Sequence, residues 1–288
     1  MTKLGQFENM PDDEYRKADA LANSDALLIA RSPSDFVWSK TAPTDPNKIN
    51  TTDIGKALHC ALLEPERFDD LVFVSSFKGR NTKGFQDEQL NNPDKLVLTN
   101  DEAEQVRIMV ASVLAHPTAK MLLEADGPCE SSVFVKDAET GMNLKCRPDK
   151  DLVNSMGLIL DIKSTSSIED WRSDREWINP LFKFNYGHQG SFYTDVCEQH
   201  YGKEIERFVF LVIQKTIELG RYPVAVISIS RDELIEQGFW TQHRVNIDRY
   251  KTCIENNNWI HFESFNLPVP DDYGDIGEVE VTFDEVQS

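Results

Sequence analysis

The chain has 288 residues, and its 40% hydrophobic content is enough to build a sizeable core within one large domain. Its 30 basic and 49 acidic residues give a formal net charge of −19, which excludes a protein that coats nucleic acid through its overall field. A nuclease is not excluded, because divalent ions bound by carboxylates can reverse the charge locally. With five cysteines in no CxxC pattern, no signal peptide and no long apolar span, we expect reduced thiols, a cytoplasmic location and no membrane segment.

Helices are expected in the first third of the chain. Ser24 or Asp25 is suited to cap a first helix, and Pro33 is expected to end it. After a loop rich in proline and asparagine, Thr52 or Asp53 is suited to cap a second helix that contains "GKALHCALL". This second helix is amphipathic and carries a histidine, which without further context is more often a hydrogen-bonded core residue than a ligand.

A glycine-containing loop, "FKGRNTKGF", is expected between the second and third helices. Its cations Lys78, Arg80 and Lys83 form a candidate phosphate clamp for DNA, although a solvated surface loop explains them equally well. The third helix, "NDEAEQVRIMVASVL", is expected to be capped by Thr99 or Asn100 and has apolar residues at helical spacing. We assign it a packing role only.

The apolar period changes to two from Glu130 onward. The segment "ESSVFVKDAETGMNLKCRPDKDLV" predicts a hairpin with Thr140 and Gly141 in its turn, and "GLILDIKST" predicts the next strand. A helix, "FNYGHQGSFYTDVCEQHYG", then precedes two apolar strands, "RFVFLVIQ" and "YPVAVISIS", and one long amphipathic helix. This order predicts an α/β fold in which helices flank a central mixed sheet.

The chain is expected to form a single domain over residues 1–268. Residues 269–288 contain acidic residues but no lysine or arginine, which predicts a flexible acidic tail. Such a tail can serve for solubility, or it can compete with phosphates for a basic surface.

Three charged residues interrupt two strand-like runs. Asp149 is expected to end one strand, and Asp161 and Lys163 lie two residues apart on the neighbouring strand, so that they share a face. All three can therefore meet at one point. An unpaired buried carboxylate costs several kcal/mol, and a hard divalent cation would compensate it. Two carboxylates with a neighbouring lysine suit phosphodiester hydrolysis, whereas "DIK" alone would equally fit a strand-end salt bridge.

The wider set of motifs narrows these alternatives. From about residue 11 to about residue 245, the segments "ANSDALLIARSPSDFVWSK", "GKALHCALLEPERF", "RPD" before "LILDIKST", "YGHQGSFYTDV" and "FVFLVIQKTIELGRYPVAVISIS" occur in order. Together they resemble the RecE family of exodeoxyribonuclease VIII-like phage and prophage proteins, within the PD-(D/E)xK nuclease superfamily. The resemblance implies the restriction-endonuclease-like core of that superfamily.

The resemblance also implies roles for individual residues. His59, Asp149 and Asp161 would coordinate the metal, and the backbone carbonyl of Ile162 is a possible further ligand. Lys163 would be the catalytic lysine. The implied cofactor is Mg²⁺, with Mn²⁺ as a substitute, and Gly55 one turn before His59 would leave space beside the imidazole.

Two interpretations are open for each of four further residues. Gln189 is expected to orient the attacking water or a phosphate, and Tyr193 to support the site or contact DNA, whereas both could simply pack a helix. Glu130 is either another metal-site carboxylate or an exposed residue at a strand start. Arg147 could touch a phosphate near the scissile bond, or pair with a neighbouring carboxylate.

The activity that the resemblance implies is Mg²⁺-dependent exonuclease action, 5′-to-3′ on double-stranded DNA ends, leaving 3′ overhangs for recombination. It also implies a homo-oligomeric ring and a RecT-like single-strand annealing partner. Three alternatives stay open: a structure-specific endonuclease, a CRISPR-associated or helicase-linked exonuclease, and a non-catalytic acidic DNA mimic. The second of these commonly carries a four-cysteine iron–sulfur site, and the cysteines of this chain are not grouped in that way.

Overall fold

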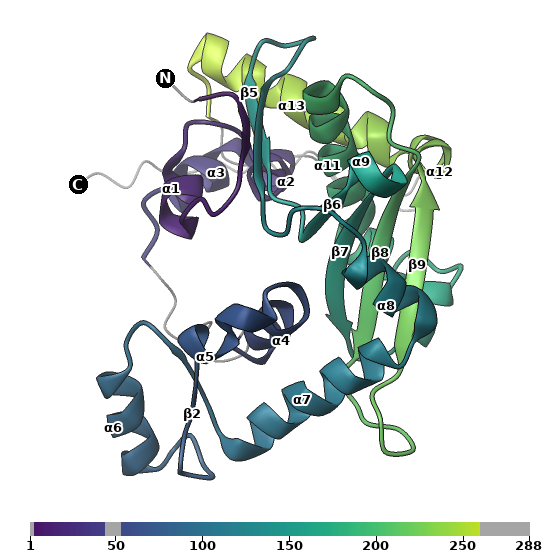
Figure 1. Ribbon diagram of the computed structural model, residues 1–288. Coiled ribbons are helices and arrows are strands. Elements are labelled where there is room, and N and C mark those ends of the chain that lie inside the picture. Colours follow the sequence, from purple (N-terminus) through teal and green to yellow (C-terminus); the bar gives the residue numbers. More distant parts are fainter. Residues whose placement is uncertain (1–2, 44–52, 260–288) are drawn as a thin grey trace, which may run out of the picture.

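A computed structural model describes residues 3–43 and 53–259 of the chain (Figure 1). Its central sheet has the strand order β6-β7-β8-β9. β7 pairs antiparallel with β6 and parallel with β8, and β8 pairs antiparallel with β9, so the sheet is mixed as predicted. The strands are β6 (Lys150–Leu152), β7 (Leu158–Thr165), β8 (Arg207–Gln214) and β9 (Val224–Ser230).

Helices cover both faces of this sheet. One face of β8, which includes Phe208 and Phe210, packs in a core with Phe192 of α11 and Ile247 of α13. The opposite face packs against α4, α7 and α8 through a second core, so that β8 is buried on both sides, as a near-continuous apolar strand predicts. These helices are α4 (Asp53–Leu63), α7 (Asn100–Leu114), α8 (Pro117–Glu124), α11 (Tyr186–Tyr201) and α13 (Phe239–Asn256).

The predicted hairpin is confirmed as β4 and β5, which pair antiparallel around a turn in which Gly141 has φ +73°. This turn needs the left-handed backbone that glycine adopts without steric cost. An N-terminal strand, β1, adds to the other edge of β4, and a parallel pair, β2 and β3, lies apart from both sheets. The strands are β1 (Gly5–Phe7), β2 (Val72–Val74), β3 (Leu96–Leu98), β4 (Ser132–Lys136) and β5 (Asn143–Cys146).

Helix ends confirm one cap prediction and correct another. Thr99 caps α7, since its hydroxyl accepts from the N–H of Glu102, whose carboxylate accepts from the N–H of Thr99 in turn. The first predicted helix, α2 (Asn23–Arg31), begins after Ala22 instead of at Ser24 or Asp25, because the Asp25 carboxylate accepts from the Ala22 N–H at 3.2 Å.

One helix boundary agrees with expectation and another differs, both for backbone reasons. The first predicted helix ends before Pro33 as expected, since α2 ends at Arg31, and Pro33 also starts α3 (Pro33–Ser39), where its missing N–H has no cost. The last helix was expected to be continuous, but Gly238, with φ +79°, separates α12 (Arg231–Glu236) from α13.

The remaining helices are short. In Figure 1, α6 lies at the lower left, away from the central sheet, and α7 runs from that region to the sheet. No single helix of residues 3–43 and 53–259 is long and apolar enough to cross a membrane, although α7 and α8, bent by 96°, pass that test as a pair. The short helices are α1 (Asp12–Lys17), α5 (Phe68–Leu71), α6 (Lys83–Asn91), α9 (Val153–Met156) and α10 (Pro180–Lys183). The predicted cap Thr52 and the acidic tail at 269–288 lie outside the described residues.

Candidate active site

The middle of β7 carries a buried ion pair. Asp161 is 2% exposed, and its Oδ2 lies 2.6 Å from Nζ of Lys163. Strand alternation places both side chains on the face toward α11, whereas Ile162 between them packs in the opposite core. Burial raises the pKa of Asp161 to about 6 against the opposing effect of Lys163. Burial lowers the pKa of Lys163, but Asp161 and Asp149 outweigh it, so that this pKa is raised and the lysine stays charged.

Asp149 lies in a bend between β5 and β6, not at the end of a strand as expected. Its Oδ2 accepts a hydrogen bond of 2.6 Å from the backbone N–H of Ile162. The carbonyl of a strand residue points to the same edge as its N–H, so the Ile162 carbonyl lies on the Asp149 side of β7. Asp149, Asp161 and Lys163 therefore meet at one point, as predicted.

His59 and Glu130 complete a cluster with Asp149. One ligand atom from each of these three side chains lies within 4.8 Å of the other two, and His59 Nδ1 is 3.5 Å from Asp149 Oδ2. His59 comes from α4, and a Cβ added at Gly55, one turn earlier, would meet nothing within 4 Å, so there is open space there as predicted. Residues from a helix, a loop and a bend thus converge beside β7.

Glu130 is not the exposed strand-start residue that one reading of the sequence allowed. It precedes β4, is partly buried, and has a left-handed backbone with φ +50°. Its N–H donates to the carbonyl of Asp149 at 3.1 Å, which holds the two residues together. Burial, followed by the charge of Asp149, raises the pKa of Glu130 to about 8. Strained backbone and a crowded carboxylate are both typical of functional sites.

α11 brings Gln189 to the ion pair. The Gln189 amide donates a hydrogen bond of 2.7 Å to Oδ1 of Asp161, whose other oxygen faces Lys163. Tyr193, one turn later, packs edge-on against Phe208 with ring centroids 6.2 Å apart and lines the cavity described below. The structure thus brings Gln189 into direct contact with the site and places Tyr193 behind it.

The basic loop after α4 is partly structural. Arg80 is not a free phosphate clamp, because its Nη1 lies 3.0 Å from Asp53 and its Nε 2.7 Å from Glu102. It joins the first turn of α4 to the first turn of α7. Lys83 begins α6 instead of lying in a loop, and both Lys78 and Lys83 are exposed.

Arg147 also has an internal role. Its Nε donates to Ser132 Oγ at 2.9 Å and its Nη2 to the carbonyl of Met10 at 3.0 Å. The guanidinium lies 4.3 Å from the ring centroid of Tyr15 and 3.6 Å from Asp12. Only 13% of the side chain is exposed, so the reading in which Arg147 pairs with a carboxylate fits the structure better than a phosphate contact.

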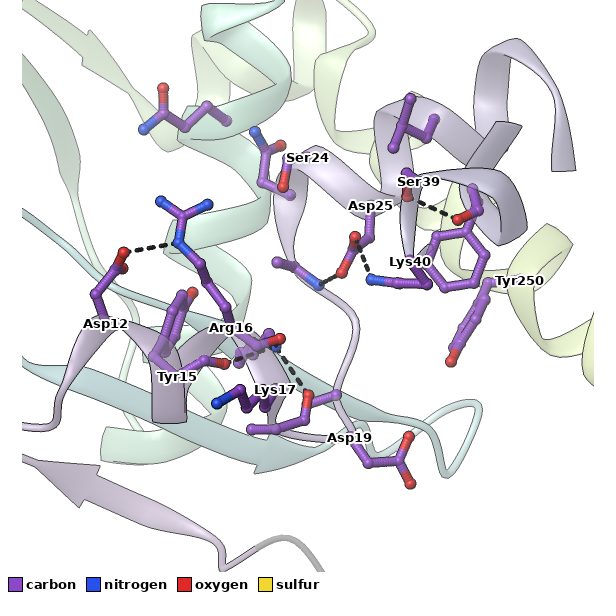
Figure 2. A pocket seen from close by; sticks show the side chains of 18 of the residues that line it. Asp12, Tyr15, Arg16, Lys17, Asp19, Ser24, Asp25, Ser39, Lys40 and Tyr250 are labelled. Atoms are coloured by element: carbon purple, nitrogen blue, oxygen red, sulfur yellow. Dashed lines mark hydrogen bonds and ion pairs between the residues drawn. The ribbon is translucent and has the colours of Figure 1, made fainter. Parts of the chain in front are cut away.

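A cavity of about 1010 Å³ adjoins the site on the side of α1, α2 and α3 (Figure 2). Gln189 and Tyr193 form part of its wall, so the cavity reaches the residue that donates a hydrogen bond to Asp161. Local sequence patterns gave no sign of its cations, because they come from separate segments. They are Arg16, Lys17, Lys40 and Lys145.

The cations that line the cavity differ in exposure and in the partners that they already have. Lys145 is 3% exposed and donates to the carbonyls of Tyr15 and Ala18, both at 2.9 Å, and burial lowers its pKa to about 8. Figure 2 shows Arg16 paired with Asp12, and the side chain of Arg16 is 76% exposed. Such an exposed pair within one helix contributes little stability and can exchange for another anion.

The donor set fits a hard divalent cation. Mg²⁺ takes oxygen ligands at about 2.0–2.1 Å, so ligands on opposite sides of one ion lie roughly 4.2 Å apart. The spacing within 4.8 Å among His59, Glu130 and Asp149 is close to that value. A cation there would also offset the charge of Asp149, which, after burial, raises the pKa of Glu130. Because Asp161 pairs with Lys163 and Gln189, it adjoins this cluster instead of joining it.

Residues 26–261 match the family described as "PDDEXK-like domain of unknown function (DUF3799)". A crystal structure described as that of a "Putative exonuclease" from Eubacterium rectale is similar over 90% of this chain and 97% of its own, with 12% identity and a TM-score of 0.58. An alkaline exonuclease from Laribacter hongkongensis matches over 70% of this chain and 89% of its own, with 11% identity and a TM-score of 0.31. No curated protein sequence matches the chain.

Proposed function

Because the chain belongs to the PDDEXK-like family and has its fold, we propose that it is a metal-dependent DNA exonuclease. One observation carries this proposal: the ligand atoms of His59, Glu130 and Asp149 converge beside the buried pair of Asp161 and Lys163. A structural salt bridge alone would explain the pair on β7. It would not explain why a histidine and two further carboxylates approach it from three other segments.

His59, Glu130 and Asp149 would hold the cation, with the carbonyl of Ile162 and Oδ2 of Asp161 as neighbouring oxygens. A divalent ion at this position would supply an acidified water and neutralise charge on a phosphate. We take Mg²⁺ as the physiological ion because two of the three side chains that would hold it, and the neighbouring Asp161, are carboxylates. Mn²⁺ is the expected substitute because it accepts imidazole more readily.

The chain's own groups have distinct tasks. Lys163 keeps its proton and places a positive charge next to Asp161, where it can stabilise a phosphate oxygen or orient a water. The Gln189 amide donates to Asp161 and fixes the carboxylate in one orientation. Since these contacts exist before substrate arrives, the site is preorganised for charge that develops on the phosphate.

Exonuclease action, as opposed to internal cleavage, is proposed from the resemblance to the RecE family. The similar structure from Eubacterium rectale is also described as that of an exonuclease, which supports this proposal. The same resemblance supports 5′-to-3′ polarity on double-stranded ends, 3′ overhangs for recombination, a ring-shaped homo-oligomer and a RecT-like annealing partner. We further propose that Arg16 and Lys17, which are exposed at the cavity beside Gln189, contact the DNA backbone.

Linear duplex DNA labelled at either the 5′ or the 3′ end, incubated with Mg²⁺ beside a covalently closed circle, tests the proposal. We expect early release of 5′-labelled mononucleotides and an untouched circle. Cutting of the circle would instead favour a structure-specific endonuclease. Binding without turnover, at every metal tried, would favour a non-catalytic DNA-binding protein. Sedimentation of the purified chain, alone and with a single-strand annealing protein, tests the ring and the partner.

A further inference from the structure

A series of aromatic contacts leads from the core to the surface beside the catalytic lysine. Trp171, which is 5% exposed, stacks on Tyr186 with ring centroids 5.6 Å apart and an interplanar angle of 18°. Phe184 contacts the same tyrosine at 5.7 Å and 46°, and is 53% exposed. Trp171, Tyr186 and Phe184 therefore form one aromatic group, and Phe184 is its solvent-exposed member.

This group touches the catalytic centre directly. Nζ of Lys163 lies 4.7 Å from the centroid of the Tyr186 ring, a cation–π contact, while the same Nζ holds Asp161 at 2.6 Å. Only one ring thus separates Phe184 from the lysine that we assign to the scissile phosphate. A base stacked on Phe184 and a phosphate held at Lys163 can therefore belong to successive nucleotides of one strand.

The backbone fixes Phe184 in this place. α10 ends at Lys183 and α11 begins at Tyr186, so that Phe184 belongs to neither helix. Asn185, between Phe184 and Tyr186, has a left-handed backbone with φ +56°, which turns the chain sharply and brings the two rings into contact. Lys183 is exposed, with its Nζ 5.3 Å from the centroid of the Phe184 ring. An exposed aromatic ring with an adjacent cation is the combination that binds single-stranded nucleic acid.

We propose that Phe184 is a stacking platform for a base of the DNA strand that enters the active site, with Lys183 beside it to meet the backbone. The proposal rests on the exonuclease function and adds a requirement to it. A base that stacks on a protein ring must leave its partner strand, so the chain would bind a frayed terminal nucleotide and not an intact terminal pair. Ends that are mismatched or already single-stranded would then be preferred, since they cost less to open.

The test uses Asp161→Asn as the parent, so that bound DNA stays uncut with Mg²⁺ present. The probe is a duplex whose terminal adenine is replaced by 2-aminopurine, a base analogue whose fluorescence falls when it stacks. Phe184→Leu keeps an apolar contact with Tyr186 but removes the aromatic face, and Phe184→Tyr keeps both. Leu219→Ala, at a fully exposed apolar residue of the β8–β9 loop, is the matched surface control.

We expect Phe184→Leu to weaken binding by roughly 5- to 100-fold and to abolish the fluorescence decrease. Phe184→Tyr and Leu219→Ala should match the parent, and all variants should share one melting temperature. In the active chain, Phe184→Leu should also reduce the preference for mismatched over paired ends.

Equal affinity and equal fluorescence in Phe184→Leu and the parent would overturn the platform while leaving the exonuclease intact. A lower melting temperature in Phe184→Leu, together with lost affinity that Phe184→Tyr does not restore, would show a purely structural role. If the parent binds no duplex and the active chain digests no DNA, the proposed function itself fails, and the platform fails with it.

Discussion

The side-chain amide of Gln189 donates a hydrogen bond of 2.7 Å to Oδ1 of Asp161. This bond ties α11 to the middle of β7 at the point where Lys163 occupies the other carboxylate oxygen. Each oxygen of Asp161 therefore has a fixed partner inside the protein. Gln189 acts through Asp161 in this arrangement, as a positioning residue for a carboxylate whose own ionisation is opposed by burial.

Lys163→Ala should abolish turnover without abolishing metal binding, because an ammonium group does not coordinate a cation. Calorimetric titration with Mn²⁺ checks the affinity, and digestion of a linear duplex checks the activity. Asp161→Ala should also be inactive, while its fold, followed by circular dichroism, should be retained. If the Lys163 variant no longer binds metal, or the Asp161 variant is fully active, the roles assigned to this pair are wrong.

Glu130→Gln should lower the affinity for Mn²⁺ at least tenfold and should not lower the melting temperature measured in EDTA. The reason is that Glu130 is partly buried next to Asp149, so its charge is unfavourable in the metal-free protein and useful only when a cation is bound. Glu66→Gln, at an exposed glutamate outside the cluster, is the control and should change neither quantity. A normal affinity in Glu130→Gln would remove this residue from the site.

Arg16→Ala should weaken duplex binding and reduce the slope of log affinity against log salt by about 1, as the loss of one phosphate contact does. Its ion pair with Asp12 is exposed, so the free energy of unfolding should change by less than about 0.5 kcal/mol. Fluorescence anisotropy across a salt series measures the slope. An unchanged slope would mean that the DNA does not pass this side of the cavity.

Arg80→Ala is expected to behave in the opposite way. Removing it leaves Asp53, which is 5% exposed, without the guanidinium that bridges it to Glu102, and should cost roughly 2 kcal/mol of unfolding free energy. Asp53→Asn in the same chain should restore part of that loss. The salt slope of DNA binding should stay unchanged, and a reduced slope with normal stability would return Arg80 to the DNA-binding surface.

His188 should contribute a loss of stability as the pH falls below neutral, opposite in sign to the contributions of Glu130 and Asp161, whose raised pKa values favour the folded chain at lower pH. The Nδ1 of His188 lies 2.7 Å from the Asn23 Oδ1, and its Nε2 lies 2.8 Å from the Asn246 Nδ2. A neutral ring satisfies both contacts, because Nδ1–H donates to Asn23 and Nε2 accepts from Asn246. Burial, followed by His243, lowers the pKa of His188 to about 3. Between pH 6.5 and pH 3 the unfolded chain therefore binds a proton that the folded chain does not, so stability decreases as the pH falls.

The expected loss from His188 is about 2 kcal/mol between pH 7 and pH 5. Urea unfolding of the wild type and of His188→Gln at the two pH values measures this loss as the difference between their pH dependences, because the variant keeps an amide donor and acceptor but does not titrate. The neighbouring His243, whose pKa burial also lowers, contributes in the same direction and can be tested alike. Equal pH dependence in wild type and in His188→Gln would contradict this prediction.

Much of the fold follows from local patterns. The capping box of Thr99, the turn at Gly141 and the apolar run of β8 each depend on residues a few positions apart, and each prediction was confirmed. The break at Gly238 was not expected, because the residues on both sides continue a helical pattern and one glycine is often tolerated within a helix.

Some site residues could be predicted from local patterns and others could not. Asp161 and Lys163 could be paired from the strand period alone, but His59 joined the site only through the resemblance to a known family. The two ion-pair partners of Arg80 lie 27 and 22 residues away along the chain, and Met10, which accepts a hydrogen bond from Arg147, lies more than 130 residues away. Periodic sequence patterns do not predict contacts over such separations. The signal for Glu130 was a glutamate next to the hairpin start, which becomes distinctive only through its backbone conformation.

The hydrogen bond from the Ile162 N–H to Asp149 has a further consequence for self-association. β6 pairs with β7 only along Leu158–Leu160, so beyond that point β7 has an edge that a strand of another molecule could extend. Asp149 occupies this edge with a side chain that accepts from the Ile162 N–H, which β6 does not pair. Asp149→Ala would leave the donor open, so this inactive variant should aggregate more readily than Asp149→Asn. Asp149, which we propose as a metal ligand, would then also prevent unwanted strand pairing between molecules.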